Sequence, residues 1–170
     1  MEVKKVNSGT KKMVTAALLA ALVCVATMII KIPTPFKGYV NLGDSVVLTA
    51  GWLLPPFYGF LAAALGSSLA DFFSGYALYA PATFVIKGIM AVTVFYGFRI
   101  FHKKLGKLSA RMASGVLAEL VMVLGYLLFE GVLYGFAPAL LNVFANGVQG
   151  AVGLLLGILL MKVTEKVIRL

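Results

Sequence analysis

Long apolar stretches, broken only at charges, prolines and glycines, run through almost the whole sequence. They occupy residues 12–30, 45–54, 57–73, 81–101, 112–129 and 138–161. A helix needs about 20 apolar residues to cross a bilayer, so the pattern predicts an all-α integral membrane protein with six transmembrane helices. The second stretch is too short for an independent crossing, because Pro55 and Pro56 end it. We expect the second and third helices to form a broken hairpin that their neighbours shield from lipid.

The composition argues against a soluble enzyme. Of the 170 residues, 61% are apolar and only 12% are charged, whereas globular domains are about half apolar and a quarter charged. Six spans leave no room for a catalytic domain outside the membrane, so we expect one membrane-embedded domain over residues 1–170. The single cysteine, Cys24, excludes a disulfide framework. The first helix lacks a signal-peptide cleavage pattern, and we expect it to be retained.

Basic residues are concentrated on one side of the predicted membrane protein. The 15 Lys and Arg residues outnumber the 6 acidic residues and give a net charge of +9. Twelve of them fall near the termini or between the fourth and fifth helices: Lys4, Lys5, Lys11, Lys12, Arg99, Lys103, Lys104, Lys107, Arg111, Lys162, Lys166 and Arg169. The positive-inside rule places both termini in the cytoplasm of a multi-pass cell-membrane protein. We therefore interpret the basic excess as a topology signal rather than as a nucleic-acid-binding surface.

Polar side chains within the spans gather toward the opposite, outer side of the membrane. Asn142, Asn146 and Gln149 repeat at i, i+4 and i+7, so they share one helix face. Similar stripes occur on the two preceding helices, at Tyr79, Thr83 and Lys87 and at Glu119, Tyr126 and Glu130. Such groups usually face the bundle interior, where tyrosine rings, amides and one cation suit a small polar aromatic ligand. We expect the substrate-binding residues to be Asn41, Asp44, Tyr79, Thr83, Lys87, Tyr126, Glu130, Tyr134, Asn142 and Asn146.

Several of these residues also have a purely structural interpretation. Lys87 could form a buried ion pair with Asp71 or Glu130. Asp44 could cap the second helix, and the asparagines of the last helix could hydrogen-bond to a neighbouring helix. The tyrosines near the outer interface could belong to an aromatic belt. Glu119 lies deeper, where we expect packing or coupling rather than ligand contact.

The first helix carries a strip of small residues suited to close approach by another helix. Ala16, Ala17, Ala20 and Ala21 form two overlapping Ala-x-x-x-Ala repeats. The inner half of the protein is therefore smooth and apolar, which favours docking of a partner there. The sequence has no Walker lysine loop, no metal-ligand cluster and no Ser-His-Asp combination. We expect no catalysis, no metal and no cofactor, and any uphill transport would need a separate motor.

Together with six spans in 170 residues and the alanine strip, three short motifs resemble one known family over nearly the whole chain. These are the segments Tyr39-Val40-Asn41-Leu42-Gly43-Asp44, Gly66-Ser67-Ser68-Leu69-Ala70-Asp71 and Tyr79-Ala80-Pro81-Ala82-Thr83-Phe84-Val85-Ile86-Lys87-Gly88. They are similar to the substrate-binding S components of energy-coupling factor (ECF) transporters, which are bacterial vitamin importers. The resemblance implies a pocket between helices four to six, lidded by the loop 31–43, that binds a water-soluble vitamin or precursor from outside. It also implies docking, through the helix-one alanines, on a membrane scaffold subunit coupled to two cytoplasmic ATPases, with reorientation of the S component in the bilayer.

The resemblance leaves several substrates open. The Asn-Leu-Gly-Asp variant most resembles the branch assigned to pyridoxine-like or hydroxymethylpyrimidine-like rings, and riboflavin is attached to similar sequences. Two other classes of function stay possible from the residues alone. The chain could be a small intramembrane enzyme that uses Asp44, Asp71 or Glu130 as acid and base, or a structural subunit without a ligand.

Overall fold

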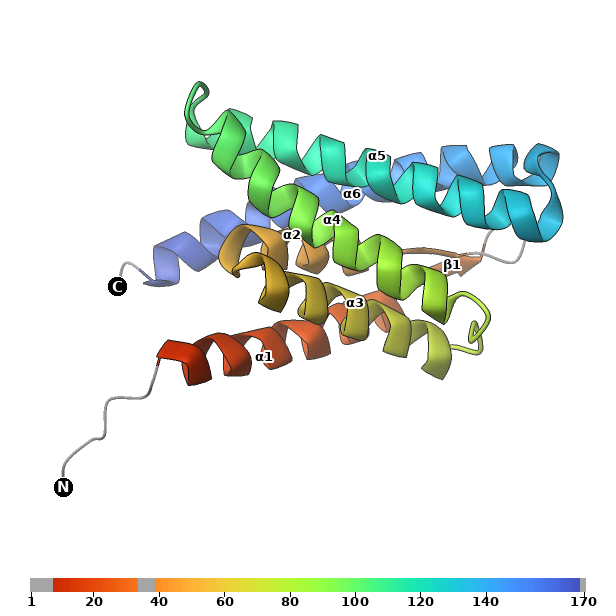
Figure 1. The fold of residues 1–170 in the computed structure, drawn as a ribbon, viewed down its shortest axis with the longest axis horizontal. Coiled ribbons are helices and arrows are strands. Elements are labelled where there is room, and N and C mark those ends of the chain that lie inside the picture. Colours follow the sequence, from red (N-terminus) through yellow and green to blue (C-terminus); the bar gives the residue numbers. More distant parts are fainter. Residues whose placement is uncertain (1–7, 34–38, 169–170) are drawn as a thin grey trace.

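Six helices and two short strands make up the computed structural model, which describes residues 8–33 and 39–168 (Figure 1). The elements are α1 (Ser8–Ile29), β1 (Lys31–Pro33), β2 (Tyr39–Asn41), α2 (Gly43–Leu53), α3 (Pro56–Phe73), α4 (Ala80–Phe101), α5 (Lys107–Tyr134) and α6 (Phe136–Ile168). Each apolar stretch of the sequence corresponds to one helix. The prediction of an all-α protein with six helices is confirmed.

Four of the six helices, α1, α4, α5 and α6, are long and apolar enough to cross a membrane. The other two are shorter, with 11 residues in α2 and 18 in α3. The prediction of six complete crossings is thus supported for these four helices only. Nine of the residues of α2, from Gly43 to Gly51, are buried, and the helix packs against α1, α3, α4 and α6. This burial agrees with the shielding expected for a segment too short to cross alone.

Two prolines separate α2 from α3. Leu54 and Pro55 have extended backbones, with ψ angles of 151° and 153°, and Pro56 begins α3. Proline is well suited to this first helical position because the amide hydrogen that it lacks would have no helical partner there. Between α5 and α6 only Gly135 connects the helices, and it has a positive φ of 92°, a conformation that glycine adopts without strain. The sharp turn there brings α6 back along α5.

The α1–α3 contact depends on a glycine. A Cβ atom added at Gly66 would lie 2.4 Å from the carbonyl oxygen of Ala20 and 2.7 Å from Cβ of Val23. Only a residue without a side chain allows the two backbones to come this close. Val23 is fully buried in the core at this point. The small residues of α1 and α3 therefore hold these two helices together.

A small antiparallel hairpin follows α1. Lys31 pairs with Asn41, Ile32 with Val40 and Pro33 with Tyr39. The segment 31–43 was expected to be a loop, and it instead contains β1, β2 and the first residue of α2. Residues 34–38 of that expected loop lie outside the described residues. The hairpin matters for the site because it places Tyr39 and Asn41 beside the helix ends.

The bundle has two different ends (Figure 1). The start of α1, the α4–α5 loop and the end of α6 lie together at one end, and the hairpin and the α5–α6 turn lie at the other. The first end carries a set of exposed lysines: Lys11, Lys12, Lys103, Lys104, Lys107, Lys162 and Lys166. Arg111 is buried at this end and pairs with Glu165, which also accepts Lys107 at 2.5 Å. Lys4, Lys5 and Arg169 lie outside the described residues.

Candidate functional site

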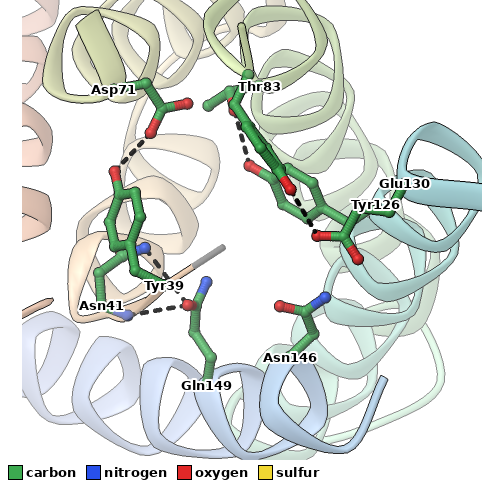
Figure 2. A pocket seen from close by; sticks show the side chains of 9 residues that line it. Tyr39, Asn41, Asp71, Thr83, Tyr126, Glu130, Asn146 and Gln149 are labelled. Carbon is green, nitrogen blue, oxygen red and sulfur yellow. Dashed lines mark hydrogen bonds between the residues drawn. The ribbon is translucent and has the colours of Figure 1, made fainter. Parts of the chain in front are cut away.

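A polar cavity lies at the hairpin end of the bundle (Figure 2). It is small, with a cavity volume of about 30 Å³ inside a wider hollow of about 390 Å³ that is partly open to solvent. The lining side chains come from β2, α3, α4, α5, α6 and the residue that precedes α4: Tyr39, Asn41, Asp71, Tyr79, Thr83, Tyr126, Glu130, Asn146 and Gln149. Tyrosines, amides and carboxyl groups thus surround one small space, with hydrogen-bonding groups on each side.

One wall of the cavity is built by Tyr39 and Asp71. The Tyr39 hydroxyl donates to Oδ1 of Asp71 at 2.5 Å, and the Tyr39 ring packs on Tyr76 with 4.7 Å between centroids. Burial, together with the negative charge of Asp71, raises the pKa of Tyr39, which keeps its hydroxyl available as a donor. Asp71 itself is only 5% exposed. This contact ties the hairpin to the end of α3.

The opposite wall joins α5 to α4 and α6. The Tyr79 hydroxyl donates to Oε1 of Glu130 at 3.4 Å, and Nδ2 of Asn142 donates to Oε2 at 3.0 Å. Nearby, the hydroxyls of Thr83 and Tyr126 are 3.0 Å apart. Both Tyr79 and Glu130 are buried. Helical spacing explains this wall, because Tyr126 and Glu130 lie one turn apart on the same face of α5.

The floor of the cavity is a buried polar network centred on Asp44. Oε1 of Gln149 accepts the backbone amide of Asn41 at 2.9 Å, and Nε2 of Gln149 donates to Oδ2 of Asp44 at 2.6 Å. The Lys87 ammonium donates to Oδ1 of the same carboxylate. Asp44 and Lys87 are 0% and 3% exposed, and a buried charge is tolerated when it is paired and hydrogen-bonded in this way. The network connects the hairpin, α2, α4 and α6.

Comparison with known proteins identifies the family of this chain. A family model described as "ECF-type riboflavin transporter, S component" matches residues 7–166. The chain belongs to this family of ECF transporter S components. The resemblance drawn from the sequence motifs is confirmed. The family is one of membrane-embedded vitamin transporter subunits, and the four long apolar helices fit a multi-pass membrane protein.

Two further similarities agree with this membership. An uncharacterized protein of Pyrococcus woesei is 37% identical over 136 residues, which cover 79% of this chain and 88% of that protein. A solved structure described as "Structure and mechanism of the S component of a bacterial ECF transporter" has a TM-score of 0.70 and 21% sequence identity. It covers 96% of this chain and 100% of that one. At this identity the match establishes the S-component fold.

Six of the ten substrate-binding residues expected from the sequence line the cavity of this S component: Asn41, Tyr79, Thr83, Tyr126, Glu130 and Asn146. The other four do not line it. Asp44 and Lys87 lie in the network beneath the cavity, and Asn142 is buried behind Glu130. Tyr134 is half-buried at the end of α5.

Two structural interpretations from the sequence are wrong. Lys87 pairs with Asp44 rather than with Asp71 or Glu130, because the first turn of α2 lies between α4 and α6. Asp44 does not cap α2, because the N-cap residue is Leu42 and no side chain makes a capping hydrogen bond there. Its carboxylate instead lies in the first helical turn, where the helix dipole favours a negative charge.

Three lining residues were absent from the expected set: Tyr39, Asp71 and Gln149. Gln149 continues the Asn142 and Asn146 stripe, so helical periodicity alone could have identified it. Tyr39 fits an aromatic belt equally well in sequence, and only its contact with Asp71 gives it a place in the cavity wall. Glu119 is buried between α5 and α6 beside Gly150 and does not line the cavity.

The alanine strip of α1 divides into two faces. Ala16 is buried and Ala20 is half-buried toward α3, whereas Ala17 and Ala21 are exposed. Residues four apart share a helix face, and a step of one residue turns the next pair away from it. In the isolated chain α3 therefore covers half of the strip, and only Ala17 and Ala21 are exposed. Docking through the four alanines stays a prediction.

Proposed function

We propose that this S component binds a water-soluble vitamin or vitamin precursor from the extracellular side, for import through an ECF transporter. The observation that carries the proposal is the polar cavity, which lies at the end of the bundle opposite the exposed lysines. Tyrosine rings can contact the faces of a heteroaromatic ring, while amide and carboxyl groups can bond to its edge. We infer that the whole chain acts as one membrane-embedded domain.

The positive-inside rule supports the orientation. The start of α1, the α4–α5 loop and the end of α6 lie at one end of the bundle and carry the seven exposed lysines named above, whereas the exposed Lys31 lies on the hairpin (Figure 1). Cytoplasmic loops are enriched in Lys and Arg, so we infer that both termini are cytoplasmic. The cavity then opens outward, where a substrate-capturing subunit meets its ligand.

We infer a single-ring ligand of the pyridoxine or hydroxymethylpyrimidine type. The space enclosed by the cavity walls is about 30 Å³, well below the roughly 300–1,000 Å³ of ligand pockets. Any ligand therefore requires the walls to move apart, and a single ring requires the smallest movement. The description of the matching family supports riboflavin as the alternative. Riboflavin has a larger fused ring system, which would require the cavity walls to move farther apart than a single ring does.

We also infer that the chain docks on a membrane scaffold subunit that couples it to two ATPases. Ala17 and Ala21 are the exposed half of the alanine strip and form a smooth, apolar face along α1. Small residues of this kind permit close helix approach in membranes. The proposed contact therefore uses these two positions, and Ala16 and Ala20 serve the internal α1–α3 packing.

Titration calorimetry on the purified protein in lipid nanodiscs tests the proposal. We expect tight binding of pyridoxine or of 4-amino-5-hydroxymethyl-2-methylpyrimidine, and weaker binding of riboflavin. Mass spectrometry of the recovered ligand separates binding from catalysis, because an S component returns the ligand unchanged whereas an enzyme returns a product. A folded protein that binds none of the three compounds would contradict the proposal and favour a structural subunit.

A further inference from the structure

The cavity wall carries two acidic side chains and, among the described residues that line it, no basic one. The acidic side chains are Asp71 and Glu130, and the other lining residues are tyrosines, amides and one threonine. All of these groups can accept hydrogen bonds, and the carboxylates accept only, when ionised. A ligand that enters the cavity therefore meets a wall rich in acceptors.

Among the described residues, Lys87 on α4 and Lys31 on β1 belong to elements beside the cavity, and both have other partners. The ammonium of Lys87 contacts Asp44 beneath the floor and lies 5.6 Å from the centroid of the Tyr126 ring. Moving it toward a ligand would leave Asp44 as an unpaired buried charge, which is strongly unfavourable. The exposed Lys31, on β1, donates to the Ser74 hydroxyl at 2.9 Å and does not line the cavity.

Asp71 has a buried oxygen, Oδ2, with no donor within hydrogen-bonding distance among the described residues, although the Thr83 hydroxyl lies close enough to interact with the carboxyl group. Its Oδ1 accepts the Tyr39 hydroxyl. Glu130 differs, because its two oxygens accept from Tyr79 and Asn142. A buried acceptor without a partner is costly and rare in folded proteins. The free oxygen therefore indicates where a donor on the ligand would bond.

We propose that the ligand is a planar heteroaromatic ring with an amino group or a protonated ring nitrogen, which donates to Oδ2 of Asp71. The same wall disfavours anions, so the phosphorylated form of such a ring is excluded. This inference rests on the proposed function, because it specifies the ligand class of the vitamin site. It also identifies Asp71, rather than Lys87, as the ionisable side chain that selects the ligand.

Calorimetry with three matched probes tests the inference. The probes are 4-amino-5-hydroxymethyl-2-methylpyrimidine, its 4-methyl analogue, which lacks the amino donor, and its phosphate monoester. We expect the amino compound to bind most tightly and the phosphate ester not to bind. Asp71→Asn should weaken binding of the amino compound by about 10- to 100-fold, the effect of one charge-assisted hydrogen bond. Glu165→Gln is the matched control, because it removes a carboxylate at the opposite end of the bundle.

The selectivity of the unmodified protein decides the question even if Asp71→Asn does not fold. Equal or tighter binding of the 4-methyl analogue or of the phosphate ester would overturn the inference and leave the proposed function standing. Binding of riboflavin, with no binding of the three probes, would also overturn the inference and leave the proposed function standing. If the folded protein binds none of these compounds and no pyridoxine, the proposed function and this inference both fail.

Discussion

The side-chain amide of Gln149 donates to Oδ2 of Asp44 at 2.6 Å, although the two residues belong to the last and second helices. Its carbonyl oxygen accepts the backbone amide of Asn41 at 2.9 Å. One buried side chain therefore holds the hairpin, α2 and α6 in a fixed relation below the cavity.

Gln149→Leu should therefore reduce both stability and ligand affinity. The substitution leaves a buried Asp44 oxygen and the Asn41 amide without their partner, at a cost of about 1–3 kcal/mol for each unsatisfied group. Thermal unfolding in detergent and vitamin titration measure the two effects. Val148→Ala is the control on the same helix, because Val148 is 46% exposed. Equal behaviour of the two variants would show that Gln149 does not organise the floor.

Lys87→Met should destabilise the protein by about 3–5 kcal/mol, because it leaves the buried Asp44 carboxylate without its cation. Adding Asp44→Asn removes that charge and retains an acceptor for Gln149. The double variant should thus be more stable than Lys87→Met alone. Unfolding temperatures of the four proteins in this mutant cycle provide the measurement. Purely additive losses would contradict a direct ion pair.

Gly66→Ala should loosen the packing of α1 on α3. The added methyl group would meet the Ala20 carbonyl oxygen at 2.4 Å, and overpacking of this kind costs about 1–3 kcal/mol. Gly147→Ala is the matched control, because a Cβ there meets nothing within 4 Å. Chemical unfolding measures the loss of stability in each variant, and we expect the larger loss for Gly66→Ala. If Gly147→Ala is the more destabilised protein, the close α1–α3 contact is not what holds α1 in place.

Tryptophan substitutions on α1 test the docking face. Ala17→Trp and Ala21→Trp lie on the exposed side and should preserve vitamin binding while they abolish uptake by the complete transporter. Ala16→Trp, at a buried position, should lower stability as well. Uptake assays in vesicles with the scaffold and ATPases, paired with binding assays on the isolated chain, distinguish these effects. Normal uptake by the Ala17 and Ala21 variants would place the docking surface elsewhere.

Cysteine labelling tests the orientation of the cavity. In a Cys24→Ala background, Ala77→Cys lies in the exposed α3–α4 loop and Ser109→Cys lies near the start of α5. We expect a membrane-impermeant maleimide to label position 77 in intact cells and position 109 only after lysis. The reverse pattern would invert the topology and make the cavity open to the cytoplasm.

The sequence predicts the helices of this protein well and their ends less well. The apolar stretch at 112–129 lies within α5 (Lys107–Tyr134), and that at 138–161 lies within α6 (Phe136–Ile168). Hydropathy detects the part of a helix that contacts lipid, and polar turns such as the one around Glu165 extend beyond it. The hairpin escaped prediction because its strands have three residues each and depend on pairing with one another.

Helical periodicity predicts only those site residues that share one face of one helix. The stripe of Asn146 and Gln149 on α6 follows from spacing alone. The Lys87 partner does not, because an ion pair depends on which helices are neighbours in the fold. Asp44 meets Lys87 only because the short α2 is inserted between α4 and α6. Nothing in the sequence spacing distinguishes Asp44 from Asp71 as that partner.

Native mass spectrometry of the protein purified in mild detergent, with and without Asn146→Trp, tests the central claim most directly. Asn146 lines the cavity, and an indole at this position fills the space that a vitamin ring would occupy. We expect the unmodified protein to retain an added vitamin and the folded variant to retain none. Retention by both proteins to the same extent would contradict the assignment of this cavity as the binding site.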